Sequence, residues 1–298
     1  MKVPPLSAII AIAVAILGCV VASAQETAGQ AVATFRSDVR LIEVYVTVLD
    51  HRGRYVTGLT RDRFEILDEG IPCPFSAFES TSSGFSCAIL LDRTGSMGLA
   101  FPAVKNAILR FIDAFRENDV FALYSFNTSL TTLVDYTRDK DAAKQAVLNT
   151  IAQGATALFD SLSAITLQLS QRKGKKAVIV FTDGADNSSY LNANAVMRRA
   201  RNSGIPVYAV AEGDALGSVE LMRTLSDLSH LTGGFAYAVN KTSRIDEVFR
   251  DISANMQNAY MLAYAPPEPN GSHWRTIRVN IKDSKGLRIR AREGYYVR

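Results

Sequence analysis

The sequence is poor in the residues on which several large protein classes depend. Its 298 residues include only three cysteines, three histidines and one tryptophan. Three cysteines are too few for a disulfide scaffold, and a formal net charge of +4 is too small to indicate a nucleic-acid-binding protein. A hydrophobic content of 48% instead indicates a globular chain, long enough for one or two domains with a sizeable core.

The sequence also lacks an apolar run long enough for a transmembrane helix near its start. The run Leu6–Val21 falls short of the roughly 20 residues that a span needs. Because Ala-Ser-Ala follows it directly at 22–24, the pattern predicts a secretory signal peptide over residues 1–24 and a mature chain that begins at Gln25. We therefore expect a periplasmic, cell-surface or secreted protein. Lipid anchoring at Cys19 is the alternative, since Ile-Leu-Gly-Cys resembles a lipobox with a poor residue before its glycine.

Two cysteines, Cys73 and Cys87, remain after export. An oxidising compartment permits a disulfide between them. Each has apolar neighbours in the sequence, which favours a lone buried thiol.

Residues 84–256 alternate between apolar runs and amphipathic stretches. The apolar runs are FSCAILLD, DVFALYSFN, KKAVIVFTDG and IPVYAVAEG. Strands that are apolar on both faces suit a parallel sheet covered by helices on each side. Helical spacing recurs between and after these runs, at Val104, Ile108, Phe111, Ile112 and Phe115, at Leu158, Leu162, Ile165 and Leu169, and at Ile245, Val248, Phe249, Ile252 and Met256. The pattern predicts an α/β domain with a doubly wound, mostly parallel, Rossmann-like sheet.

The two flanks, 25–83 and 257–298, have a different texture. Val39–Leu49 alternates in the manner of a strand, and so do Trp274–Lys282 and the segment LRIRAREGYYV. Neither flank offers enough strands to close a sandwich alone. We therefore expect the two flanks to pair in a small β-sandwich-like module, into which 84–256 is inserted.

Oxygen-bearing side chains follow the predicted parallel strands. Asp92, Thr94 and Ser96 alternate along the loop after the first strand, Thr156 precedes a helix, and Asp183 ends the KKAVIVF strand. Ligand sites in open α/β sheets lie at the carboxyl ends of strands. Carboxylates and hydroxyls are hard ligands suited to Mg²⁺, Ca²⁺ or Mn²⁺. The alternative is a vestigial turn held by hydrogen bonds from Asp and Ser side chains to the backbone.

These residues resemble the von Willebrand factor type A domain and its metal-ion-dependent adhesion site, whose pattern is Asp-x-Ser-x-Ser with a distant Thr and a distant Asp. Asp92, Ser96, Thr156 and Asp183 match it, and Thr94 departs from it but keeps the hydroxyl. Asp186 and Asn187 lie close by in the sequence and are candidates for supporting roles only.

The flanks are similar to those of a bacterial exported branch of that family. The matching segments are the VxVxVxD strand, the stretch GL…FEILDEG, and the ending YxLxY…IRV…RAREGYY. With these flanks the resemblance spans nearly the whole mature chain.

Other catalytic and nucleotide-binding patterns fit poorly. Arg93 interrupts the Asp-Thr-Gly-Ser pattern of aspartic proteases, and Thr94 stands where haloacid-dehalogenase-type phosphatases need a second Asp. The sequence has no Walker phosphate loop, no G-x-S-x-G elbow and no H-E-x-x-H helix, and its histidines (His51, His230 and His273) are scattered.

The resemblance implies an exported, non-catalytic protein whose divalent cation accepts an Asp or Glu carboxylate from a protein or matrix partner. One alternative is an envelope scaffold or complex subunit that does not use the metal for binding, and a more remote one is a metal-assisted hydrolase. Arg288, Arg290 and Arg292 are predicted to share one strand face. That face would either contact anionic envelope polymers or lipids, or be a solvated, edge-protecting surface. The oligomeric state stays open.

Overall fold

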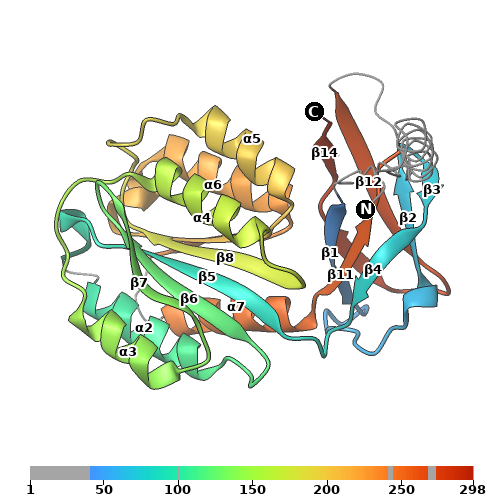
Figure 1. Ribbon diagram of the computed structural model, residues 1–298, viewed down its shortest axis with the longest axis horizontal. Helices are drawn as coiled ribbons and strands as arrows, with labels where there is room; N and C mark the ends of the chain where they lie inside the picture. Colours follow the sequence, from blue (N-terminus) through green and yellow to red (C-terminus); the bar gives the residue numbers. More distant parts are fainter. Residues whose placement is uncertain (1–40, 99–100, 241–243, 268–272, 298) are drawn as a thin grey trace, which may run out of the picture. The chain divides into compact units, whose positions relative to one another are not determined.

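The computed structural model describes residues 41–98, 101–240, 244–267 and 273–297 (Figure 1). The expected signal peptide and Cys19 lie outside these residues. Within the described ranges, no helix combines the length and the apolar character needed to cross a membrane.

A six-stranded sheet forms the centre of the α/β region, in the order β10-β9-β8-β5-β6-β7. Its strands are β5 (Phe85–Asp92), β6 (Val120–Phe126), β7 (Leu130–Thr137), β8 (Lys175–Thr182), β9 (Val207–Glu212) and β10 (Ala236–Val239). All neighbouring strands pair in parallel except β6 and β7, which pair antiparallel. The predicted fold class, an α/β protein with a mostly parallel sheet, is therefore confirmed.

Helices cover both faces of this sheet (Figure 1). On one face lie α2 (Phe101–Asp113), α3 (Lys140–Asn149) and α7 (Ile245–Asn258), and on the other lie α4 (Leu158–Ser170), α5 (Ala193–Ser203) and α6 (Val219–Thr232). Successive residues of β5 feed opposite cores: Ile89 packs into the first and Leu90 into the second. This is why the strand has an unbroken apolar sequence. Single turns of 3₁₀ helix occur at Arg61–Arg63 (η1), Gly95–Gly98 (η2) and Gly213–Gly217 (η3).

The strands of the two flanks pair with one another across the sequence. One four-stranded sheet has the order β13-β1-β11-β4, and the other has the order β14-β12-β2-β3. Their strands are β1 (Ile42–Leu49), β2 (Phe64–Asp68), β3 (Ile71–Cys73), β4 (Phe75–Glu79), β11 (Tyr260–Tyr264), β12 (Trp274–Ile281), β13 (Arg288–Ala291) and β14 (Gly294–Tyr296). Side chains from both sheets form one hydrophobic core, so each sheet buries the apolar face that the other needs.

Cys73 and Cys87 are both buried and free. Cys73 lies in β3 and Cys87 in β5, and neither takes part in a disulfide. Burial raises the pKa of the Cys87 thiol well above its usual value, which keeps the thiol protonated and unreactive.

The sequence predicted that Arg288, Arg290 and Arg292 share one solvated strand face, and this prediction is wrong for Arg292. Arg288 and Arg290 are exposed, but Arg292 lies just beyond β13 and is only 3% exposed. Its Nε donates to the Gly294 carbonyl (3.0 Å) and its Nη2 to the Arg201 carbonyl (2.6 Å). Because the Arg201 carbonyl lies 91 positions earlier in the sequence, the alternating sequence pattern gave no sign of this burial.

A buried polar cluster joins four strands of the two flanks. Asp68, at the end of β2, is fully buried and accepts a hydrogen bond from Arg275 Nε of β12 at 2.7 Å. It also accepts from the hydroxyls of Tyr264 (2.8 Å) and Tyr295 (2.7 Å), in β11 and β14. The charge of Arg275 is thus compensated inside the core, and the carboxylate has three donors.

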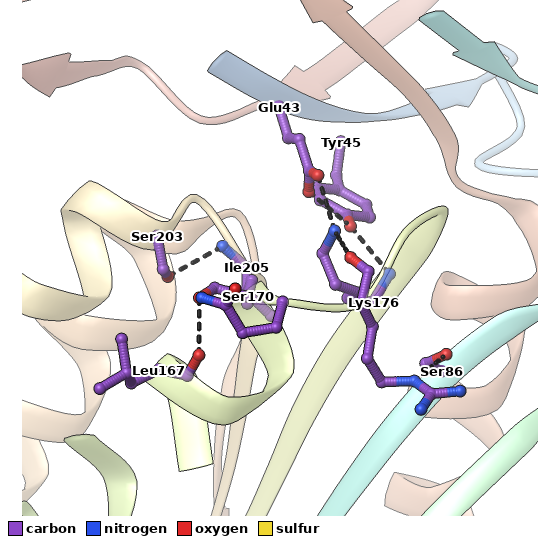
Figure 2. A network of polar contacts seen from close by, with 10 residues as sticks. Glu43, Tyr45, Ser86, Leu167, Ser170, Lys176, Ser203 and Ile205 are labelled. Carbon is purple, nitrogen blue, oxygen red and sulfur yellow. Dashed lines mark hydrogen bonds and ion pairs between the residues drawn. The ribbon is translucent and has the colours of Figure 1, made fainter. Parts of the chain in front are cut away.

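A second polar network joins β1 to the amino end of β8 (Figure 2). Lys176 Nζ lies 2.6 Å from Glu43 Oε1 and donates to the Arg172 carbonyl at 2.8 Å. The Lys176 backbone N–H donates to the Tyr45 hydroxyl at 2.8 Å. The network therefore fixes the first residues of β8 to the first half of β1.

Candidate metal centre

Asp92 is the last residue of β5, and its carboxylate is held from two sides. Its side chain is completely buried. Oδ1 accepts from the Thr94 backbone N–H (2.9 Å) and Oδ2 from the Thr182 hydroxyl (2.8 Å), at the end of the neighbouring strand β8. These two bonds orient the carboxylate at the carboxyl edge of the sheet, where the turn into η2 begins.

The loop after β5 brings Asp92, Thr94 and Ser96 to the same edge as Asp183. Thr94 Oγ1 and Ser96 Oγ lie 3.0 Å apart, and Ser96 Oγ donates to Asp183 Oδ1 at 2.8 Å. Thr94 and Asp183 are buried, whereas Ser96 is exposed. The cluster of oxygens therefore reaches solvent on the side of Ser96.

Thr156 comes from the connection between α3 and α4 and lies at the same place. A Cβ added to Gly184 would lie 3.6 Å from both Ser96 Oγ and Thr156 Oγ1. Because residue 184 has no side chain, the space beside these two hydroxyls stays open. The structure thus brings all five predicted residues together: Asp92, Thr94, Ser96, Thr156 and Asp183.

Asp186 and Asn187 support the connection that carries Thr156. Asn187 Oδ1 accepts from the Thr156 backbone N–H at 2.8 Å, and Asp186 Oδ2 accepts from the Phe159 N–H, in the first turn of α4, at 2.8 Å. A carboxylate at the amino end of a helix also interacts favourably with the helix dipole. Both residues therefore hold the loop in place from outside the cluster of five.

The two carboxylates of the cluster are buried close to each other without a cationic neighbour. Burial raises the pKa of Asp92 despite its hydrogen bonds to Thr94 and Thr182. Burial raises the pKa of Asp183 to about 6. The hydrogen bond from Ser96 opposes this shift, and the negative charges of Asp92 and Asp214 add to it. Within the described ranges, no lysine, arginine or histidine forms an ion pair with either carboxylate. Their negative charge is therefore uncompensated by the protein.

Asp214 is an acidic residue near the site that the sequence reasoning missed. It lies in η3, directly after β9, and is exposed. The next residue, Ala215, donates its backbone N–H to the Asp183 carbonyl at 2.6 Å. A signal was present, because IPVYAVAEG is a parallel strand next to β8, and residues just beyond its carboxyl end lie at the same sheet edge.

The donor set fits a hard divalent cation. In the described part of the chain, no group of three or more His, Cys, Asp or Glu side chains gathers to form a metal site. The cluster at the sheet edge instead combines two carboxylates with three hydroxyls. Oxygen donors of this kind suit Mg²⁺, Mn²⁺ or Ca²⁺, and no thiolate or imidazole is present to favour a softer metal.

Comparison with known protein families agrees with this geometry. The model of the von Willebrand factor type A domain matches residues 87–251, which is more than half of the chain. The chain belongs to this family. The matched region contains all five residues of the cluster and all of the central sheet except the first two residues of β5.

Solved structures similar to this chain are von Willebrand factor A domains at low sequence identity. The von Willebrand factor type A protein from Catenulispora acidiphila aligns with a TM-score of 0.54 and 15% identity, over 88% of this chain and 74% of that one. Proximal thread matrix protein 1 from the mussel byssus, solved with a zinc-occupied metal-ion-dependent adhesion motif, aligns with a TM-score of 0.52 and 18% identity, over 65% of this chain and 50% of that one. These likenesses show the fold.

A curated relative comes from Borreliella burgdorferi and is described as an uncharacterized protein. It is 25% identical over 201 residues, which are 58% of this chain. The chain matches 59% of the length of that relative. The assignment to the family therefore rests on the domain match.

Proposed function

We propose that this protein is a divalent-cation-dependent binding protein, in which Asp92, Thr94, Ser96, Thr156 and Asp183 hold Mg²⁺ or a similar cation. The observation that carries the proposal is the pair of buried carboxylates, Asp92 and Asp183, which form no ion pair with a cationic side chain in the described part of the chain. Buried carboxylates are costly unless they are paired or coordinate a metal. A divalent cation would supply the missing positive charge.

The mechanism that we propose is adhesion through a carboxylate of the partner. Three of the five oxygens belong to neutral hydroxyls, which leave the cation more electrophilic than a site made of carboxylates alone. Ser96 is exposed whereas the other four side chains are buried, so the cation would be reached from the side of Ser96. An Asp or Glu of a protein or matrix partner could bind there.

We further propose that the protein is exported and is not an enzyme. The signal-peptide pattern at 1–24 supports export. Across the described residues, no histidine or lysine makes a hydrogen bond or ion pair with the five side chains, so neither of these residue types is placed to act as the general base of a hydrolase. Binding needs no such group.

Calorimetric titration of Mg²⁺ and Mn²⁺ tests the cation site. We expect Asp92→Ala to abolish binding, because it removes one of two carboxylates, while the apolar strands keep the fold. Thr94→Ser is the matched control, since it keeps the hydroxyl and restores the usual family residue. It should bind like the wild type, whereas Thr94→Val, which keeps the shape and removes the oxygen, should bind at least several-fold more weakly. Equal affinity in all four proteins, or no binding in any, would refute the proposal.

Capture experiments test the adhesion step separately. Wild-type protein, Asp92→Ala and Thr94→Ser are each used to capture proteins from envelope extracts, with and without EDTA. A partner retained by the wild type and by Thr94→Ser, and released by EDTA, supports adhesion through the cation. A partner retained equally by Asp92→Ala and in EDTA would indicate a scaffold whose cation site is not used for binding.

A further inference from the structure

A cleft of about 660 Å³ lies along one face of α5. Asn194, Arg198, Arg201 and Asn202 line it at positions i, i+4, i+7 and i+8 of the helix. This spacing places the four side chains on a single helix face. Tyr296, in the last strand, lines the cleft as well.

The cleft carries a concentrated positive charge. Three of its lining residues are arginines, namely Arg198, Arg199 and Arg201, and none of its lining residues is acidic. In the described residues none of the three forms an ion pair, whereas arginines elsewhere do so, as Arg110 does with Asp246 at 2.6 Å. No carboxylate of the described residues therefore neutralises these three guanidinium charges.

Two of these arginines are held in place by the protein. Arg199 Nη1 donates to Ser163 Oγ at 2.5 Å. The Arg201 guanidinium lies over Tyr296, with 5.6 Å between its Cζ and the ring centroid. Its Nε is buried and has no hydrogen-bond acceptor among the described residues. A buried donor of this kind costs free energy unless an acceptor reaches it, so a ligand oxygen would be favourable here.

A second hollow of about 360 Å³ extends the cleft between α4 and α5. It shares Arg199 and Asn202 with the cleft, and it is lined by the hydroxyl side chains Ser163, Thr166, Ser170 and Ser203. Ser170 donates to the Leu167 carbonyl at 2.6 Å (Figure 2), and Ser203 donates to the Ala200 carbonyl at 2.8 Å. Ser203 Oγ also accepts from the Ile205 N–H at 3.2 Å and Ser170 Oγ from Gln171 Nε2 at 3.4 Å. Each oxygen therefore keeps one further lone pair, which suits a hydroxyl group of a ligand.

We propose that this cleft binds a phosphomonoester of a sugar or polyol. Guanidinium groups bind phosphate oxygens in a bidentate manner. A phosphomonoester carries about −1.5 to −2 charges at neutral pH. It therefore balances the charge of three arginines better than a ligand with a single carboxylate would. The hydroxyl-lined hollow accepts the polyol part. The volume of the cleft falls within the roughly 300–1,000 Å³ of small-molecule sites.

Calorimetric titration with glycerol 3-phosphate and glucose 6-phosphate tests the proposal, with citrate as a non-phosphate anion. We expect the double variant Arg198→Gln/Arg199→Gln to bind at least 10-fold more weakly than the wild type, since it loses the charge-assisted hydrogen bonds of two guanidinium groups to the phosphate. The matched control is Arg223→Gln on α6, whose side chain is 83% exposed and which removes one positive charge outside the cleft. It should bind like the wild type. Arg198→Lys, which keeps the charge without the bidentate geometry, should be intermediate.

Vesicles of phosphatidylcholine with and without phosphatidic acid distinguish the source of the phosphate. Arginine-dependent binding to phosphatidic acid, with no binding of the soluble esters, assigns the cleft to a lipid headgroup, and the reverse assigns it to a soluble ester. Circular dichroism checks that each variant is folded. If the double variant is unfolded, the single variant Arg198→Gln is used in its place. The proposal is refuted if citrate binds and no phosphate compound does, if none binds, or if binding is insensitive to the cleft arginines.

Discussion

Replacing Asp68 by asparagine should destabilise the module that the two chain ends share. The change keeps the shape of the side chain and removes its charge. In the wild type this carboxylate is fully buried and accepts from Arg275 Nε, Tyr264 and Tyr295 at 2.7 to 2.8 Å. The variant therefore leaves the Arg275 guanidinium, which is 9% exposed, without an anion inside the core.

The expected loss is large because the pair is buried. Removing one partner of a buried ion pair costs about 3–5 kcal/mol, most of it from the uncompensated charge that remains. The two tyrosine hydroxyls can still donate to the amide oxygen of asparagine, so they add little to the loss. We expect the free energy of unfolding to fall by about 3 kcal/mol or more.

Urea unfolding followed by tryptophan fluorescence measures this loss. Trp274 is the single tryptophan of the chain and precedes Arg275 in β12, so its emission reports directly on the affected sheet. The matched control is Asp283→Asn, whose side chain is 90% exposed and lies 3.9 Å from an arginine. Exposed pairs of this kind contribute at most about 1 kcal/mol. If Asp68→Asn costs no more than this control, the buried pair does not stabilise the module as we argue.

Three further predictions concern separate parts of the chain. Gly184→Ala should weaken cation binding several-fold, because its methyl would occupy the open space beside two hydroxyls of the site. It should leave the protein folded, because the methyl would lie 3.6 Å from both oxygens, an ordinary contact distance; calorimetry checks the affinity, and an unchanged value would contradict the prediction. Lys175→Met should raise the free energy of unfolding at pH 7 by up to about 3 kcal/mol, since burial lowers the pKa of Lys175 to about 8 and the folded state disfavours its charge. In the wild type, unfolding experiments across pH should show stability rising between about pH 8 and pH 10.5, where the unfolded chain binds more protons, and Lys175→Met should lack this rise. N-terminal sequencing of the exported protein should show that the mature chain begins at Gln25. A chain that begins at a lipidated Cys19 would contradict this and indicate a lipid-anchored protein.

The central sheet and the candidate site could be predicted because their signals are local. The runs that became β5, β6, β8 and β9 are apolar on both faces, and such runs have few alternatives to a covered parallel sheet. Asp92 and Asp183 come at the ends of two of these strands, so the rule for ligand sites in α/β sheets was enough to place them together.

Other features depend on contacts that no local pattern contains. Strand β7 was missed because it is an edge strand whose residues are half-buried or exposed, so it lacks the apolar run of its neighbours. Arg275 lies on the inner face of β12, where its charge is tolerated only because Asp68, 207 positions earlier, faces it. Arg292 is buried for a similar reason, since it donates to the carbonyl of Arg201.

If the cation site binds a ligand as we propose, the network at Lys176 has a mechanical consequence. Strand β8 runs from the Lys176–Glu43 pair at its amino end to Thr182, which bonds Asp92, at its carboxyl end. A pull on a ligand at the cation site would therefore load this strand along its length and pass to β1. Strand β1 is bonded on both sides, to β11 and to β13, so its hydrogen bonds would bear the force together, in shear. The same eight residues of β8 thus link the point where force would enter the domain to the sheet in which β1 pairs with β11 and β13.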